Sequence, residues 1–241
     1  MKNASTRYIG FPIYDGVSAG DFIGPAELFR FCGKDFQPIF LAPTIRSYLS
    51  AENLVIVPNF TFDHHPDLYM VFVPGGSGIG TKTTMLDPRY LDWIKKVDQH
   101  TQWTGSVCTG AFILAATGLL DGMAATTYWS QLENLSLFPE LSVDQNNFPR
   151  ALIDVQRQRF TGGGISSATD LALELLIEIE GKDTAELGQL QVQYAPNPPV
   201  HAGDPSQASP ELVNKLEKAH EPVATRFIRE GVEETLASQS G

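Results

Sequence analysis

Short apolar runs alternate with polar segments along most of the chain. Residues 7–14 (RYIGFPIY) and 36–42 (FQPIFLA) have the length and composition of strands. Residues 68–73 (LYMVFV) form a nearly continuous apolar run, which is typical of a strand buried on both faces of a parallel sheet. Gly24-Pro25 predicts a short helix over 25–31, because proline suits the first helical turn.

The alternation continues through the middle of the chain. Residues 54–62 are extended, and a proline among them indicates an edge strand or a break. Asp87-Pro88 predicts a helix that runs to about residue 99, and a strand over 101–107 and a helix over 109–116 follow. Three later segments look extended: 124–129, 142–145 and 151–160. Thr161-Gly162-Gly163-Gly164 then leads into a predicted helix over 166–180, and a second helical stretch covers 184–194. Alternating strands and helices imply βαβ units around a parallel sheet, and therefore an α/β fold.

The composition changes at residue 195. Residues 195–210 (APNPPVHAGDPSQASP) are rich in Pro, Gly and Ser and cannot form a regular helix or strand. An amphipathic pattern over 211–236 predicts a C-terminal helix. We therefore divide the chain into an α/β domain, 1–194, and an arm with a helix, 195–241. We expect the second part to pack on a partner subunit or on the parent domain, as part of a dimer.

Charge and cysteine content narrow the partners and the compartment. The 241 residues include 28 acidic and 17 basic side chains, which gives a net charge of −11. This balance disfavours nucleic acid and anionic membranes, because both attract basic proteins. The two cysteines form no disulfide framework and no CxxC pattern. The first apolar run is too short for a signal peptide, and no run reaches the roughly 18 apolar residues of a membrane span. We expect a cytoplasmic protein.

The stretch GSVCTGAFILAA (105–116) places Cys108 at the junction of a predicted strand and a predicted helix. A strand that turns abruptly into a helix exposes the residue at the corner, as in the nucleophile elbow of other α/β enzymes. The helix N-terminus carries partial positive charge, which favours the thiolate. The amides of Thr109 and Gly110 can donate hydrogen bonds to developing negative charge. Cys108 is therefore a candidate nucleophile.

Two further segments are predicted to end at the same edge of the sheet. Ligands of open parallel sheets bind outside the carboxyl ends of the strands. Gly75 and Gly76 follow the strand over 68–73, so their backbone amides can face Cys108. Asp21, in SAGDFIGP, follows the first strand, and its carboxyl group can transfer protons to or from a substrate bound to sulfur.

Each of these residues also has a purely structural interpretation. A cysteine after a strand is often a small buried hydrophobe, and an aspartate such as Asp21 is typical of a turn or a helix cap. Gly75-Gly76 is also a common way to leave a strand. Cys32 follows an apolar helix face and is expected to pack there. The five histidines show no spacing typical of a metal site, so we predict none.

Together, the segments resemble the DJ-1/PfpI superfamily over nearly the whole chain, and most closely its isonitrile hydratase branch. The motifs are DFIGPAELF from Asp21, VFVPGGSGIG from Val71, SVCTGAFILAATGLLDGMAATTYW from Ser106 and TGGGISSATDLALELL from Thr161. The cysteine elbow with CTG is highly specific to the superfamily. The segment from Gln191, QVQYAPNPPVHAGDP, adds the C-terminal arm that points to the hydratase branch.

The resemblance implies a flavodoxin-like α/β sandwich, usually a homodimer, that needs no metal and no organic cofactor. It implies that Cys108 is the nucleophile, that Asp21 hydrogen-bonds to it, and that Thr109 shapes the site with its amide and hydroxyl. The residues expected around the substrate are Gly75, Gly76, Gly110, Tyr128, Trp129 and Ile165, the last packing near the cysteine-bearing helix.

The chain departs from the family pattern at several positions. Tyr128 stands where the branch commonly has histidine, so the substrate preference can differ. Ala19 and Gly20 are small, which leaves the pocket near Asp21 roomier. Protease-like members have histidine directly after the cysteine, and Thr109 at this position disfavours peptidase chemistry. A related group of transcription factors carries an added DNA-binding domain, which we do not expect in this acidic chain.

The resemblance favours hydration of an isonitrile, R–N≡C, to the N-substituted formamide through a cysteine thioimidate. Two other functions stay open from the sequence. The same thiol and carboxyl group can act on small reactive carbonyls such as methylglyoxal, as in other superfamily members. Alternatively, Cys108 is an oxidisable thiol in a sensor without enzymatic activity.

Overall fold

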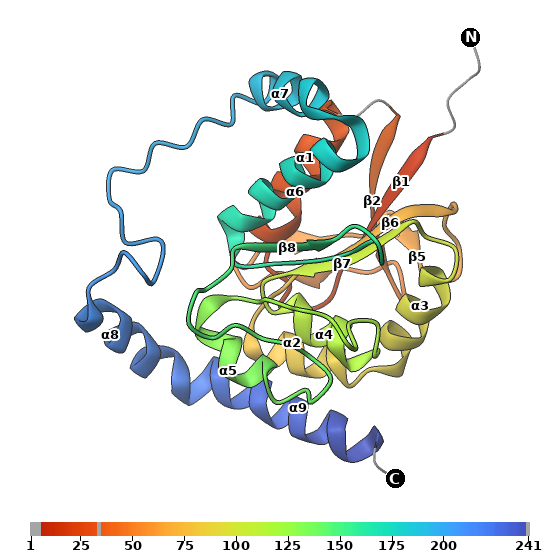
Figure 1. Ribbon diagram of the computed structural model, residues 1–241. Helices are drawn as coiled ribbons and strands as arrows, with labels where there is room; N and C mark the ends of the chain where they lie inside the picture. Colours follow the sequence, from red (N-terminus) through yellow and green to blue (C-terminus); the bar gives the residue numbers. More distant parts are fainter. Residues whose placement is uncertain (1–5, 33–34, 240–241) are drawn as a thin grey trace.

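A seven-stranded, mostly parallel sheet forms the centre of the protein (Figure 1). The computed structural model describes residues 6–32 and 35–239, with the backbone alone for residues 220–222. In the part of the chain described, the antiparallel pair of this sheet is β8–β9, and its other neighbouring strands are parallel. The strands are β1 (Arg7–Pro12), β2 (Phe36–Ala42), β5 (Phe60–Thr61), β6 (Leu68–Val73), β7 (Trp103–Val107), β8 (Ala151–Asp154) and β9 (Arg159–Gly162).

The strand order places the candidate residues at one edge of the sheet. The order is β5-β2-β1-β6-β7-β9-β8, so the central strands β2-β1-β6-β7-β9 follow the 2-1-3-4-5 order of flavodoxin-like folds. The chain reverses direction across the sheet between β1 and β6, and a crevice forms at such a switch point. Asp21 follows β1, Gly75 follows β6, and Cys108 follows β7. The expected flavodoxin-like architecture is confirmed.

Helices cover both faces of this sheet (Figure 1). One face carries α1 (Gly20–Cys32), α6 (Ile165–Glu180) and α7 (Lys182–Gln191), which contact one another. The other face carries α2 (Gly78–Met85), α3 (Pro88–Asp98), α4 (Gly110–Ala116) and α9 (Arg226–Gln239). The short α5 (Leu132–Leu135) and a 3₁₀ turn (Trp129–Gln131) lie in the long connection from β7 to β8. None of the helices described is both long and apolar enough to cross a membrane.

The most deeply buried elements adjoin the candidate site. Four of the six β6 residues, from Met70 to Val73, are completely buried, as the continuous apolar run predicted. All seven residues of α4 are buried as well. Phe72 packs between Phe11 and Phe160, with ring centroids 5.3 and 5.1 Å away. The turn between β7 and α4 is therefore held between a buried strand and a buried helix, which fixes its position.

Several elements differ from the sequence-based prediction. α1 begins at Gly20 rather than near Pro25, so Asp21 lies in the first turn of the helix. α2 was not predicted, because its sequence, GIGTKTTM, is rich in glycine and threonine. In the structure the Ser77 side chain caps this helix by accepting a hydrogen bond from the Gly80 amide at 3.2 Å. Residues 151–160 form β8, a turn and the start of β9, rather than one extended segment.

A small antiparallel pair lies outside the main sheet. β3 (Tyr48–Leu49) pairs with β4 (Val55–Ile56), and neither strand was predicted as a separate element. The predicted extended segment 54–62 is divided into β4 and β5, with Pro58 between them. β5 is an edge strand, as the proline indicated.

The C-terminal segment contains two helices instead of the single helix predicted. α8 (Pro210–His220) and α9 are joined by a π-helical segment, Glu221–Thr225. α9 packs on α2 of the same chain, with Val232 completely buried, and the Lys82 amine bridges Glu230 and Glu234 at 2.9 and 2.8 Å. α9 therefore belongs to the α/β unit.

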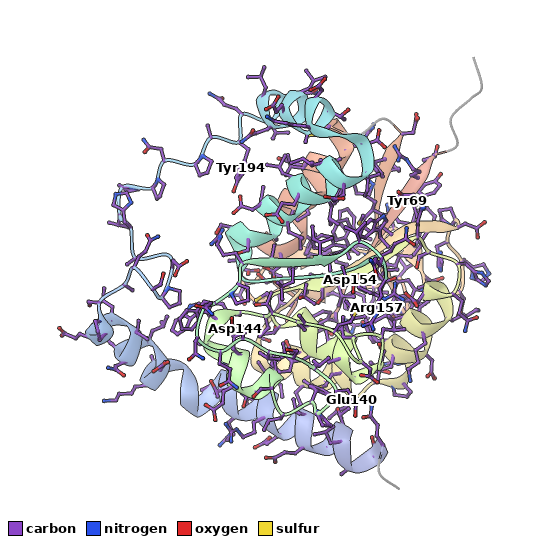
Figure 2. The ribbon with its side chains drawn as sticks, in the orientation of Figure 1. Tyr69, Glu140, Asp144, Asp154, Arg157 and Tyr194 are labelled. Carbon is purple, nitrogen blue, oxygen red and sulfur yellow. The ribbon has the colours of Figure 1, made fainter. Side chains whose placement is uncertain are left out.

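The arm begins where α7 ends, beside Tyr194 (Figure 2). The Tyr194 hydroxyl donates a hydrogen bond to Asp170 Oδ1, 2.6 Å, which ties this end of the arm to α6. From there the arm passes along the outside of the molecule to α8 (Figure 1). The arm thus connects the two faces of the sheet, and its packing on a second subunit stays a prediction.

Because α9 is packed against the domain and α8 is exposed, we predict that α9 contributes more to the free energy of unfolding than α8. Ile228 of α9 is 1% exposed, whereas Leu212 of α8 is 52% exposed. We expect Ile228→Ala to lower the free energy of unfolding by about 2–5 kcal/mol, because it removes buried methyl groups and leaves a cavity. Leu212→Ala, the matched control, should change it by less than about 0.5 kcal/mol. Urea denaturation of the two variants measures the difference, and equal effects would show that α9 is not anchored as described.

Candidate active site

Cys108 occupies a sharp turn between β7 and α4. Its φ angle is 52°, in the left-handed region that is unfavourable for residues with a side chain. Its amide donates to the carbonyl oxygens of Gly162 and Gly163, both at 2.9 Å, and its carbonyl accepts from Thr127 Oγ1 at 2.7 Å. These bonds hold the unfavourable backbone in place. The predicted sharp turn from strand to helix, with Cys108 at its corner, is present.

Asp21 lies beside this elbow with its side chain completely buried. Its Oδ2 accepts a hydrogen bond from the Gly75 amide, 3.0 Å, while its Oδ1 is buried without a partner in the part of the chain described. Burial raises the pKa of Asp21 to about 7, although the Gly75 amide and a hydrogen bond with the Cys108 side chain act in the opposite direction. Asp21 therefore changes protonation near neutral pH, unlike an ordinary aspartate.

The pKa of the Cys108 thiol moves opposite to our expectation. The helix N-terminus predicted a lowered pKa, but burial and the nearby charge of Asp21 raise it, and the hydrogen bond from the Thr109 amide only partly compensates. Cys108 is only partly exposed, and it lines a cavity. The raised pKa favours the protonated thiol, and the carboxyl group of Asp21 lies beside it.

Gly75 brings these groups together because it has no side chain. A Cβ atom at this position would lie 2.6 Å from the Thr109 amide nitrogen, 2.7 Å from Cys108 Cβ and 2.9 Å from Asp21 Oδ2. Such distances are shorter than real Cβ contacts. The sequence pattern identified Gly75 only as a strand exit that could face Cys108. The structure shows the steric reason for glycine.

The amides of the glycine pair are not free to bind a substrate. The Gly75 amide donates to Asp21, and the Gly76 amide donates to Thr109 Oγ1 at 2.9 Å. The Thr109 hydroxyl lies 2.8 Å from the Thr81 hydroxyl and is buried. Gly75 lies against Cys108 and Gly76 lines the cavity, as expected, but the amides of both residues bind Asp21 and Thr109 and so fix the elbow. Gly110 packs closely against the backbone of β6, so it too serves packing.

A cavity of about 670 Å³ opens next to Cys108. Tyr128, Trp129 and Phe148 form an aromatic wall, with centroids 5.8 Å apart for the first pair and 6.4 Å for the second. Ile165, the first residue of α6, is 58% exposed and also lines the cavity, and its Cγ2 lies against Gly20. The structure therefore brings Tyr128, Trp129 and Ile165 to the site as the family resemblance implied.

Sequence reasoning missed several residues of this cavity. They come from the loop between β3 and β4, the connection from β7 to β8, the arm, the segment before α9 and α9 itself: Glu52, Phe148, Arg150, Asp204, Ala224 and Ile228. Nothing in their local sequence marks them, because only tertiary packing brings these segments to the elbow. The arm and α9 thus contribute to the cavity wall, which was not predicted.

The other residues considered from the sequence are Cys32 and the histidines. Cys32 is buried at the end of α1 against Gly188, and burial raises its pKa to about 11, so its expected packing role is confirmed. His65 accepts a hydrogen bond from Trp93 Nε1 at 3.1 Å. Across the residues that the structure describes, no three His, Cys, Asp or Glu side chains gather as metal ligands would.

Comparison with known proteins agrees with this arrangement. The sequence profile of the DJ-1/PfpI family matches residues 7–178. The isonitrile hydratase of Pseudomonas putida is 36% identical over 214 residues, which are 89% of this chain and 90% of that protein. The chain belongs to the DJ-1/PfpI family.

Other relatives of this chain include a protein of known structure and a transcriptional regulator. A ThiJ/PfpI family protein from Pseudomonas syringae has a structure that superimposes with a TM-score of 0.86 at 28% identity, covering 95% of this chain and 91% of that one. The transcriptional regulator GbdR of Pseudomonas aeruginosa is 25% identical over 188 residues, which are 76% of this chain but 49% of the regulator. The family therefore includes both an enzyme and regulators among the relatives of this chain.

The close contacts of Gly75 in this DJ-1/PfpI site generate a stability prediction. Gly75→Ala should lower the free energy of unfolding by about 1–3 kcal/mol, since the new methyl group overlaps the Thr109 backbone and the elbow cannot shift freely. Gly203→Ala is the matched control, because Gly203 also lines the cavity but a Cβ there would meet nothing within 4 Å. Urea titration of both variants tests this, and a Gly75→Ala protein as stable as the control would contradict the crowded geometry.

Proposed function

We propose that the protein hydrates an isonitrile to the N-substituted formamide, with Cys108 as nucleophile and Asp21 as proton carrier. The observation that carries the proposal is the buried Asp21 carboxyl group placed beside the Cys108 thiol at the cavity. The likeness to the Pseudomonas putida isonitrile hydratase, over nearly the whole of both chains, supports the choice of reaction. The related regulators mean that family membership alone does not decide the activity.

In the first step, the sulfur of Cys108 forms a bond to the terminal carbon of the isonitrile. Asp21 accepts the thiol proton as the sulfur attacks and delivers it to that carbon, which gives a thioimidate, R–N=CH–S–Cys108. A carboxyl group with an ordinary pKa is a weak base, whereas one with a pKa of about 7 both accepts and returns a proton near neutral pH. The raised pKa of Asp21 therefore suits both halves of this step.

In the second step, water adds to the thioimidate carbon. Asp21, ionised again, removes a proton from the water and delivers it to the imine nitrogen, which gives the tetrahedral adduct R–NH–CH(OH)–S–Cys108. The carbon–sulfur bond then breaks as the hydroxyl group becomes the carbonyl, its proton passes by way of Asp21 to the sulfur, and R–NH–CHO leaves. One water is consumed and no oxidant or reductant is needed. The amide of Thr109, which points at the sulfur, stabilises negative charge on it as it departs.

The cavity favours an uncharged substrate with an apolar R group. Its wall contains the rings of Tyr128, Trp129 and Phe148 and the side chain of Ile228. An isonitrile carries no net charge, and its carbon must reach the Cys108 thiol in the cavity wall. Burial raises the pKa of Tyr128, and the charge that Cys108 would carry as a thiolate raises it further, so the Tyr128 hydroxyl stays protonated near the reacting group.

The proposal predicts formamide formation that depends on both groups. With cyclohexyl isonitrile as substrate, Cys108→Ala should lower kcat by at least about 10³-fold, because no thioimidate can form. Asp21→Asn keeps the shape of the side chain but cannot accept a proton, and should lower kcat by about 10²–10⁴-fold. Cys32→Ser, which changes the other cysteine, should turn over at the wild-type rate. Formamide is quantified by chromatography with mass detection.

Two results would contradict the proposal. Turnover by Cys108→Ala at the wild-type rate would remove the cysteine from the reaction. Conversion of methylglyoxal to lactate, with no formamide from any alkyl or aryl isonitrile, would favour action on small carbonyls instead.

A further inference from the structure

Glu52 reaches from the loop between β3 and β4 to the start of α1. Its Oε1 accepts a hydrogen bond from Ser18 Oγ and its Oε2 accepts one from the Ala19 amide, both at 3.1 Å. Glu52 also lines the cavity that contains Cys108. No sequence motif includes this residue, and the reaction as described above does not use it.

The loop that carries Glu52 is itself firmly held. Ser50 is buried, and its hydroxyl accepts hydrogen bonds from the amides of Glu52, 3.2 Å, and Leu54, 3.1 Å. The Ala51 amide donates to the Val17 carbonyl at 2.9 Å. The carboxylate is therefore presented by an ordered turn, although the loop lies at the surface.

A closed set of hydrogen bonds joins the Glu52 contacts to the thiol site. The Asp21 amide donates to the Ser18 carbonyl at 3.3 Å, and the Ser18 amide donates to the Gly75 carbonyl at 2.8 Å. The Gly75 amide donates in turn to Asp21 Oδ2. Ser18, Asp21 and Gly75 are therefore joined by hydrogen bonds. Glu52 is bonded to this group through the Ser18 hydroxyl and the neighbouring Ala19 amide.

Glu52 is also the ionised neighbour of Asp21. Three titratable groups interact with the Asp21 carboxyl group: Tyr14 at the end of β1, Cys108 at the elbow and Glu52. The Tyr14 hydroxyl donates to the Pro74 carbonyl at 3.0 Å, and burial raises the pKa of both Tyr14 and Cys108, so both are neutral at pH 7.

The charge of Glu52 persists to lower pH than that of an ordinary glutamate. Burial acts to raise the Glu52 pKa, but hydrogen bonds from the Ala19 amide and from the Ser50 and Ser18 hydroxyls outweigh it, and the pKa is lowered. This negative charge adds to the effect of burial on Asp21.

We infer that Glu52 is a positioning residue for the Cys108–Asp21 pair: its carboxylate binds Ser18 and Ala19 and so fixes the turn that carries Asp21, and its negative charge acts on that pair. The role in turnover rests on the proposed function, but the action on the thiol–carboxyl pair does not. A residue that only stabilised the fold would leave the protonation behaviour of this pair unchanged. The pH dependence therefore separates the two roles.

The experiment compares Glu52→Gln and Glu52→Ala with the wild type. Glu217→Gln in α8 is the matched control, since it removes the same charge from an exposed helix. The first readout is the rate of Cys108 alkylation by iodoacetamide between pH 5 and about 10, followed by mass spectrometry of the peptide that contains Cys108. The second readout is the pH profile of kcat/KM for formamide formation.

The sign of the expected shift follows from charge. Removing a negative charge makes ionisation of both Asp21 and Cys108 easier, so both pH profiles of Glu52→Gln should move to lower pH. Glu52→Ala loses the two hydrogen bonds as well and should also lower kcat/KM at its optimum by about 10- to 100-fold, with partial rescue in Glu52→Gln. Glu217→Gln should match the wild type.

The outcomes distinguish this inference from the proposed function. If the alkylation profile of Glu52→Gln coincides with that of the wild type and of Glu217→Gln, the inference is overturned. If the alkylation profile shifts but no isonitrile is turned over, the action of Glu52 on the thiol–carboxyl pair is supported and hydration is refuted.

Discussion

The site depends on a buried carboxyl group and a partly buried thiol being held side by side. Neither Asp21 nor Cys108 has an ordinary pKa. Burial raises the pKa of both groups, and the charge of Asp21 raises the pKa of Cys108 further. Contact between them requires that Gly75 lack a side chain, since a Cβ atom would occupy the space that they share. The proposed reaction depends on this contact, because it uses a proton exchanged between the sulfur of Cys108 and the carboxyl group of Asp21.

Three strands that are adjacent in the sheet bring these residues together. Asp21, Gly75 and Cys108 follow β1, β6 and β7, which are neighbours in the sheet, and the first two strands flank the point where the chain order reverses. The segments added around this frame have a different role. The loop with Glu52, the arm with Asp204 and the helix with Ile228 build the cavity walls, and so determine what reaches the thiol.

The sequence predicted which residues lie at the site better than it predicted their pKa shifts. A cysteine between a strand and a helix, and an aspartate after the first strand, could be identified because strand ends converge in a parallel sheet. The direction of the Cys108 pKa shift could not, because it depends on burial and on the distance to Asp21, which a sequence does not state. The contribution of Glu52 was missed for the same reason, and the π-helical break before α9 has no signal beyond Pro222. The family resemblance reduced the number of candidate reactions, but it does not decide between enzyme and regulator, because relatives of both kinds exist.

A crystal structure of the protein frozen during turnover of an aryl isonitrile tests the central claim most directly. We predict continuous density from Cys108 Sγ to one carbon of the substrate, with the aryl group against the aromatic wall and the Asp21 carboxyl group beside the new bond. Substrate bound in the cavity with an unmodified sulfur, while the same crystals release formamide, would contradict the account.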